Sequence, residues 1–196
     1  ALDPARAFSR IRASGARLPF FLDSGPFGGR SFMGAEPDAV LQFVGGKTIL
    51  QEGGRRTVLE EDPFGALGKQ IAAGGFWAGF LSYDLGRRIE GTPAHGIEDG
   101  TLPLMRLARY RDVLVYDHEA RSWRVESASP GVPDWLSAAA RPAGPLPAFT
   151  LGSWGPSIPK GDYLAAVARA QEMIRQGEIY QANFSHRFTA PFSGDP

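Results

Sequence analysis

The residues that could do acid–base or metal chemistry in this chain of 196 residues are few and scattered. Three histidines, His95, His118 and His186, lie far apart and lack the spacing of metal ligands. The chain has no cysteine, which excludes thiolate nucleophiles, disulfides and Cys-based metal sites. His118 falls at a predicted hairpin turn, where a solvated side chain is expected. His186 falls on a predicted strand, where a structural role is the simpler interpretation.

Two further segments are rich in polar residues or glycine, and neither predicts a catalytic site. The carboxylates Asp84, Glu90, Glu98 and Asp99 lie in or near a predicted loop, which is typical of solvated surface. Residues 25–29 (GPFGG) lack the Lys-Ser/Thr pair that follows a phosphate-binding loop, so they predict a turn.

The overall composition predicts a soluble globular protein and excludes several classes of function. The 21 basic and 21 acidic residues balance to a net charge of zero, so the chain lacks the basic field that holds a nucleic-acid backbone. No apolar run approaches the ~18 residues needed to cross a bilayer. The N-terminus carries Asp3 and no apolar stretch, which argues against a secretory signal. We expect a cytoplasmic protein that binds neither nucleic acid nor membranes.

Apolar periodicity and turn residues predict an α+β fold, with mostly antiparallel sheets and helices packed on them. Helices are predicted at residues 4–12, 63–73 and 162–176, the first of them capped by Asp3. Strands are predicted at residues 19–22, 31–34, 39–43, 48–51, 76–81, 105–116, 122–126 and 179–188. Ala78 and Gly79 in one of these strands indicate that a neighbouring strand packs closely against it. Residues 86–102 are predicted to form an irregular surface loop that could include a short helix.

A change of composition divides the chain near residue 150. Residues 127–156 are rich in proline, which predicts a linker with one short helix at residues 135–140. We therefore expect one domain over residues 1–150 and the incomplete start of a second over residues 151–196, because a lone helix and strand cannot bury two faces. The strand at residues 179–188 would leave an unpaired edge, through which a homo-oligomer could form.

The most specific pattern follows the last predicted helix, at residues 178–188 (EIYQANFSHRF). It resembles the segment "G-D-I-Y-Q-x-x-x-S-x-R-F", which opens the chorismate-binding domain of aminodeoxychorismate and anthranilate synthases. Glu178 stands where this family usually has Asp. Ala182 and Asn183 resemble the aminodeoxychorismate branch, because anthranilate synthases tend to carry two valines there. Residues 193–195 (SGD) fit the same branch.

Upstream segments resemble the same family in the same order. Residues 21–25 (FLDSG) and 30–37 (RSFMGAEP) resemble its first hairpin. Residues 79–87 (GFLSYDLGR) resemble its "G-Y-L-S-Y-D-L-G-R" strand, and residues 116–118 (YDH) resemble its "D-H" hairpin. The chain as a whole thus resembles the truncated N-terminal portion of component I of these synthases.

The resemblance implies an enzyme that binds chorismate with magnesium and replaces its ring hydroxyl with ammonia from a glutamine amidotransferase subunit or domain. The aminodeoxychorismate branch uses a lysine nucleophile and forms 4-amino-4-deoxychorismate, a precursor of 4-aminobenzoate and folate. The anthranilate branch aminates the neighbouring position and eliminates pyruvate.

The motifs that carry this chemistry in the family, the "P-I-K-G-T" lysine and the magnesium glutamates, follow the "Y-Q" segment and do not occur here. Residues 158–161 (IPKG) resemble the lysine motif only in passing, because they precede the helix and lack the threonine. We therefore expect no catalytic and no metal-binding residue in this chain, and no activity from it alone.

The resemblance assigns a regulatory site to the first hairpin, which in the family helps to form a tryptophan pocket between two domains. Here the pocket would involve Leu22, Asp23, Ser24, Ser31, Phe32 and Met33. Apolar walls for an indole and polar groups for the ends of an amino acid suit such a pocket. Asp23 is shorter than the Glu that anthranilate synthases often have there. The alternative is that Asp23 and Ser24 satisfy backbone groups at a strand end.

Two other functions stay open from the sequence. The chain could belong to an anthranilate synthase component I of the tryptophan pathway, or it could be a free-standing module that binds tryptophan or docks a glutaminase.

Overall fold

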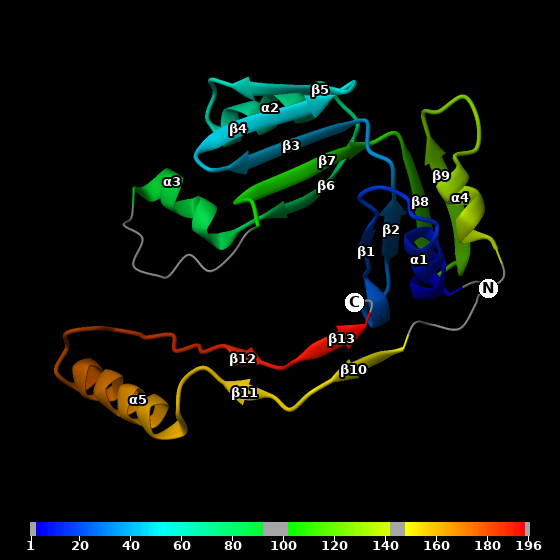
Figure 1. Cartoon of the computed structure of the whole chain (residues 1–196). Helices are drawn as coiled ribbons and strands as arrows, with labels where there is room; N and C mark the ends of the chain where they lie inside the picture. Colours follow the sequence, from blue (N-terminus) through cyan, green and yellow to red (C-terminus); the bar gives the residue numbers. More distant parts are fainter. Residues whose placement is uncertain (1–2, 92–101, 142–147, 195–196) are drawn as a thin grey trace. The chain divides into compact units, whose positions relative to one another are not determined.

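The computed structural model describes residues 3–91, 102–141 and 148–194. The chain divides into two compact units, residues 1–143 and 144–196. Figure 1 labels the elements, which in the first unit are α1 (Pro4–Ala13), β1 (Phe20–Leu22), η1 (Gly25–Phe27), β2 (Arg30–Gly34), β3 (Ala39–Val44), β4 (Lys47–Glu52), β5 (Arg55–Leu59), α2 (Pro63–Ala72), β6 (Phe76–Leu81), η2 (Tyr83–Gly86), α3 (Arg87–Glu90), β7 (Met105–Tyr110), β8 (Asp112–Asp117), β9 (Ser122–Ser127) and α4 (Asp134–Ala139).

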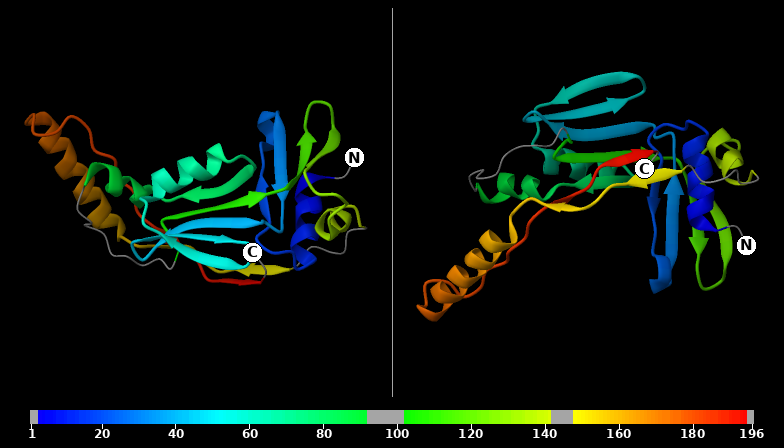
Figure 2. Two further views of the ribbon diagram at one scale, coloured as in Figure 1. Left: turned by 90° about the horizontal axis from the view of Figure 1, so that it is seen from above. Right: turned by 60° about the horizontal axis from the view of Figure 1, so that its bottom comes forward.

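The strands of the first unit form two antiparallel sheets. One has the strand order β1-β2-β8-β9 and the other the order β5-β4-β3-β7-β6. Strands of the two sheets run at a large angle to each other, and the chain passes between the sheets from β2 to β3 and from β7 to β8 (Figure 2). The predicted α+β fold with mostly antiparallel sheets is confirmed. The single strand predicted at residues 105–116 is wrong, because at Arg111 the chain leaves one sheet for the other while its apolar alternation continues.

The two passages between the sheets are joined by the carboxylate of Asp38. It accepts hydrogen bonds from Arg109 Nε (2.8 Å) and Nη2 (3.2 Å) and from Arg111 Nε (2.8 Å). Burial raises the pKa of Asp38, but the hydrogen bonds and charges of the two arginines outweigh it and lower the pKa below its ordinary value. This ion-pair cluster therefore helps to fix where the chain changes sheets.

Helices cover one face of each sheet. Asp3 caps α1 by accepting from the backbone N–H of Arg6, as predicted, and Asp62 caps α2 in the same way at Phe64. α1 and α4 lie on the four-stranded sheet, and α2 lies on the five-stranded sheet (Figure 1). The short helix predicted within the proline-rich segment is α4, and it packs on the first unit, because Trp135 is buried against α1.

Aromatic side chains fill the space between the two sheets. Phe20 and Phe32 of the four-stranded sheet pack against Phe76 and Tyr110 of the five-stranded sheet.

Gly79 lies where β6 and β7 approach closely, since a Cβ atom there would come within 2.0 Å of the carbonyl oxygen of Arg106. The close neighbour predicted for Ala78 and Gly79 is therefore strand β7.

The second unit contains β10 (Phe149–Leu151), β11 (Gly155–Pro156), α5 (Lys160–Arg175), β12 (Phe188–Thr189) and β13 (Phe192–Gly194). β10 pairs with β13 and β11 with β12, both antiparallel, and within α5 only Ala170 is buried. The predicted helix at 162–176 is present.

The strand predicted at residues 179–188 is wrong, because only Phe188 and Thr189 pair and residues 179–187 are irregular. Its apolar pattern has no neighbouring strand of described residues to pair with. The homo-oligomer expected through an unpaired edge at residues 179–188 stays a prediction, although the strand on which it was based is not formed. Among the described helices, none combines the length and apolar character that crossing a membrane requires.

Candidate functional site

Three of the expected tryptophan-pocket residues meet where β1 and β2 approach their connecting turn. Ser31, which is fully buried, donates its hydroxyl hydrogen to Asp23 Oδ1 at 2.6 Å. The same hydroxyl oxygen accepts the backbone N–H of Ser24 at 3.2 Å. Asp23 Oδ1 also accepts the backbone N–H of Gly25 at 3.1 Å. Part of the Asp23 carboxylate thus shapes its own turn, as the alternative interpretation of this segment requires.

The side chain of His118 completes this cluster, although it was expected to be solvated. Its Nε2 atom lies 2.7 Å from Ser31 Oγ and 3.7 Å from Asp23 Oδ1, and its side chain is only 21% exposed. Strand pairing brings it there, because β2 and β8 align Arg30 with Asp117 and so place the next residue beside the β1–β2 turn. The Asp-His pair of residues 117–118 was visible in the sequence, but its partner 87 residues earlier was not.

The hydrogen-bond inventory of Ser31 fixes the role of each atom. A hydroxyl has one hydrogen to donate, and an ionised carboxylate can only accept. Since Ser31 donates to Asp23, His118 must donate its Nε2–H to Ser31 Oγ. This requires either the Nε2–H tautomer of the neutral ring or the imidazolium ion.

Backbone contacts and one ion pair hold the two turns together around this cluster. The backbone N–H of His118 donates to the carbonyl oxygen of Gly29 at 3.0 Å. Arg30 Nε lies 3.4 Å from Asp117 Oδ2. The pKa of Asp117 is lowered, first by a hydrogen bond from the backbone N–H of Ala120 and also by Arg30 and the N–H of Glu119. The charged form of Asp117 therefore favours the β8–β9 turn that carries His118.

The other expected pocket residues do not share one surface. Leu22 and Phe32 lie opposite each other in the β1–β2 pair, and Phe32 faces the space between the sheets. Met33 lies opposite Phe21 on the other face and is fully buried under α1 and α4. The sheet thus separates Leu22 and Phe32 from Ser31 and Met33, as alternation along a strand requires.

One polar atom of the cluster has no partner in the described part of the chain. The hydroxyl oxygen of Ser24 is buried and makes no hydrogen bond there. Buried hydroxyl groups are normally hydrogen-bonded, so the hydroxyl of Ser24 is an exception in this turn.

The remaining polar residues singled out from the sequence lie elsewhere. His186 belongs to the second unit, where its ring centroid lies 5.1 Å from that of Tyr163 and 4.5 Å from that of Phe188. Asp84 pairs with Arg87 at 2.9 Å. Glu90 lies in α3. His95, Glu98 and Asp99 lie outside the described residues. Across residues 3–91, 102–141 and 148–194, no group of three or more His, Cys, Asp or Glu is placed to hold a metal ion.

The first unit thus has two antiparallel sheets with this polar hairpin, and the segment at residues 178–188 follows in the second unit. A profile of the chorismate binding enzyme family matches residues 18–196, and the chain belongs to that family. The resemblance that was identified from the sequence is confirmed.

Curated relatives agree with this assignment. The chain is 29% identical to aminodeoxychorismate synthase component 1 of Escherichia coli over 96% of the chain and 45% of that protein. It is 32% identical to aminodeoxychorismate synthase component 1 of Klebsiella aerogenes over 82% of the chain and 39% of that protein. It is 26% identical to anthranilate synthase component 1 of Methanothermobacter thermautotrophicus over 84% of the chain. The chain thus spans less than half the length of these relatives.

A solved structure shows the same fold. The crystal structure of anthranilate synthase component I from Streptococcus pneumoniae superposes with a TM-score of 0.66 and covers 90% of this chain and 45% of that one. The two sequences are 23% identical over the match, so this likeness concerns the fold alone.

Proposed function

We propose that this chain is the N-terminal part of a chorismate-aminating synthase subunit of the aminodeoxychorismate type. Such an enzyme converts chorismate and ammonia into 4-amino-4-deoxychorismate, and its ammonia comes from a glutamine amidotransferase partner. The observation that carries the proposal is the 29% and 32% identity to two aminodeoxychorismate synthase components over most of the chain. Ala182 and Asn183 in the segment at residues 178–188 support the same branch.

We also propose that the whole enzyme uses magnesium. A hard cation of this kind binds carboxylate oxygens, and chorismate carries two carboxylates. The described residues do not fit such a site, since they hold no cluster of three acidic or histidine side chains that could bind a metal. No step of the reaction is therefore assigned to magnesium on this chain.

The cluster around Ser31 is the part of the proposed enzyme that this chain would supply to regulation. A tryptophan ammonium group would be met by the second oxygen of the partly exposed Asp23, and by the hydroxyl of Ser24 once that side chain turns outward. Ser31 would hold Asp23 in place, because it donates to the first carboxylate oxygen of Asp23. His118 would in turn hold Ser31 through its contact with the Ser31 hydroxyl.

An activity assay with a chimera tests the main proposal. The chimera joins this chain to the part of the Escherichia coli component that it does not cover, and it is incubated with chorismate, magnesium and an ammonium salt. We expect amination by the chimera and no product from the chain alone. A folded chimera without activity would favour the free-standing module instead.

Calorimetry with tryptophan tests the regulatory site separately. Binding that Ser24→Ala and Asp23→Asn weaken, and that the exposed control Ser122→Ala leaves unchanged, supports the site. Equal binding by all variants, or none by the parent chain, removes the regulatory assignment and leaves the family assignment intact.

Anthranilate synthase component I is the second candidate function, favoured by the 26% identity to the Methanothermobacter thermautotrophicus protein. The products distinguish the two branches when the protein that carries this sequence is assayed with chorismate and ammonia. Anthranilate is fluorescent and is released together with pyruvate, whereas 4-amino-4-deoxychorismate retains the side chain.

A further inference from the structure

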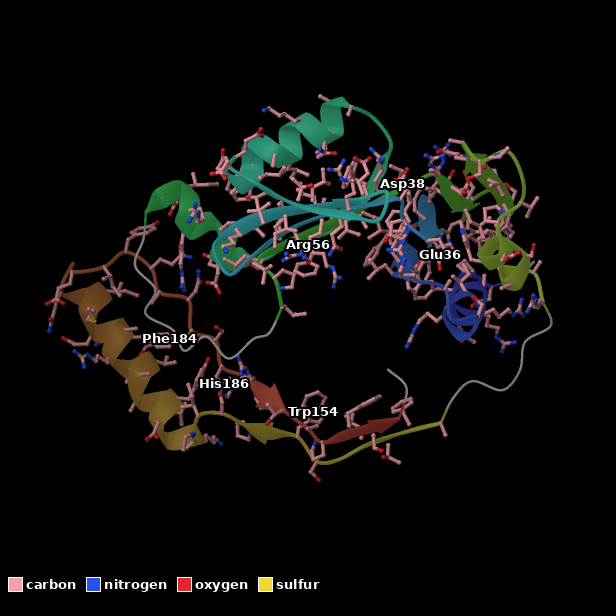
Figure 3. The ribbon with its side chains drawn as sticks, turned by 45° about the horizontal axis from the view of Figure 1, so that its top comes forward. Glu36, Asp38, Arg56, Trp154, Phe184 and His186 are labelled. Carbon is pink, nitrogen blue, oxygen red and sulfur yellow. The ribbon has the colours of Figure 1, made fainter. Side chains whose placement is uncertain are left out.

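A cavity of about 270 Å³ opens at the end of the five-stranded sheet where β4 turns into β5. Arg17, Arg55 and Arg56 line it, together with the carboxylates of Asp38 and Glu52. Asp38 lies where the chain passes between the sheets, and Arg56 lies on the edge strand β5 (Figure 3). All of these residues belong to the first unit, so the cavity does not depend on how the two units are placed.

The carboxylates of Asp38 and Glu52 are already paired with arginines that lie outside the cavity. Asp38 accepts three hydrogen bonds from Arg109 and Arg111. Glu52 accepts one from Arg109 Nη2 at 2.5 Å. Neither Arg109 nor Arg111 lines the cavity, so both acidic side chains are occupied by cations that a ligand would not contact.

The arginines of the cavity are less compensated. The strand register sets Arg56 opposite Gln51, a neutral residue, and Arg55 opposite Glu52, whose carboxylate already accepts from Arg109. The described residues provide no recorded ion pair for Arg55 or Arg56. Arg17 donates from Nη2 to the carbonyl oxygen of Pro37 at 2.6 Å and lies 3.5 Å from a half-exposed Glu36. A chain of zero net charge thus concentrates unbalanced positive charge at this cavity.

We propose that this cavity binds a small oxyanion, either a short dicarboxylate or a phosphate. Planar guanidinium groups match carboxylate and phosphate oxygens with paired N–H donors. A cavity of about 270 Å³ leaves room for a compact anion beside the arginine side chains. The turn at Gly53 and Gly54 carries no side chain and leaves one end of the cavity open. This site is independent of the proposed synthase function, and its failure would leave that proposal untouched.

The test is a titration of the 196-residue chain with malonate and with inorganic phosphate, followed through the Nε–H signals of its arginines by NMR. We expect saturable shifts at Arg56 and Arg17. Arg56→Gln should weaken binding by roughly tenfold or more, as expected for the loss of one charge-assisted contact. Arg124→Gln is the matched control, because Arg124 is an exposed arginine on β9 that pairs with Glu126 and does not line the cavity.

The outcomes are distinct. Saturable binding of either probe that depends on Arg56 supports the site, and the ratio of the two affinities shows whether carboxylate or phosphate is preferred. Shifts that sodium chloride reproduces at equal ionic strength would reduce the effect to charge screening and overturn the proposal. Binding that is unchanged in Arg56→Gln would overturn it as well. Because Arg56 is exposed, circular dichroism of the variant should match that of the parent chain.

Discussion

His118 Nε2 lies 2.7 Å from Ser31 Oγ, and this contact joins two hairpin turns that are 87 residues apart in the chain. Ser31 is fully buried and donates to Asp23. His118 therefore acts on Asp23 through Ser31 and takes the role of a positioning residue. Because Ser31 donates its only hydroxyl hydrogen to Asp23, the short contact with His118 requires His118 to be the donor.

A double-mutant cycle measures this contact. We expect His118→Leu and Ser31→Ala each to lower the free energy of unfolding, with a coupling of about 1 kcal/mol between them, the usual net contribution of one hydrogen bond. Urea denaturation of the four proteins gives the coupling. Purely additive effects would show that the two side chains do not interact in solution. The ¹⁵N shifts of the His118 ring provide a second readout, and a neutral ring protonated at Nδ1 would contradict the donor assigned here.

Acid should unfold the chain partly through Asp38. Its pKa is lowered in the folded protein, so the unfolded state binds the proton more readily. Its contribution to stability is present above the ordinary value of 3.8 and is lost as pH falls through the folded value. We expect Asp38→Asn to flatten the fall of stability with pH below about pH 4.

Asp117→Asn is the comparison for this acid effect. The pKa of Asp117 is also lowered, but solvent screens its exposed contacts. We therefore expect a smaller change than for Asp38, measured as urea midpoints at several pH values. An equal or larger change for Asp117→Asn would mean that the Asp38 cluster contributes little to the junction of the sheets.

The sequence predicted those elements whose signal is local. The cap at Asp3 and the boundaries of β6 follow from residue types within a few positions. Gly45 and Gly46, which both adopt positive φ, form the turn between β3 and β4 and are a local hairpin signal of the same kind. Such signals need no knowledge of the rest of the chain.

Features that depend on distant partners could not be predicted in this way. Arg111 separates β7 from β8 because its side chain donates to Asp38, which lies where the chain changes sheets. His118 is only 21% exposed because β2 lies beside β8. The resemblance placed Leu22 and Phe32 in one tryptophan pocket with Ser31 and Met33, and the observed register puts the two pairs on opposite faces of the sheet. Which of these residues bind a ligand stays a prediction.

Gly79 should tolerate no larger residue. A Cβ atom there would come within 2.0 Å of Arg106 O and 2.7 Å of Leu107 Cα, both backbone atoms of β7 that cannot rotate away. We expect Gly79→Ala to destabilise the first unit by about 3 kcal/mol, at the upper end for an overpacked site.

Gly68→Ala is the matched control for this substitution. Gly68 lies in α2 with nothing within 4 Å of an added Cβ, so alanine there should be neutral or stabilise by up to about 1 kcal/mol. Thermal unfolding of both variants gives the comparison. Similar melting temperatures for the two would mean that β6 and β7 separate more easily than this packing implies.

Residues 179–187 should exchange their amide hydrogens much faster than β8. Apart from the N–H of Arg187, which donates to Ser157 Oγ at 3.0 Å, the described structure records no hydrogen bond from a backbone N–H of this stretch. In β8, by contrast, the backbone is paired on both sides, with β2 and β9. Hydrogen exchange followed by mass spectrometry of peptic fragments separates the two stretches. Slow exchange across residues 179–187 in a dimer would restore the predicted strand and place its partner in a second copy, because an irregular, solvated backbone cannot protect its own amides.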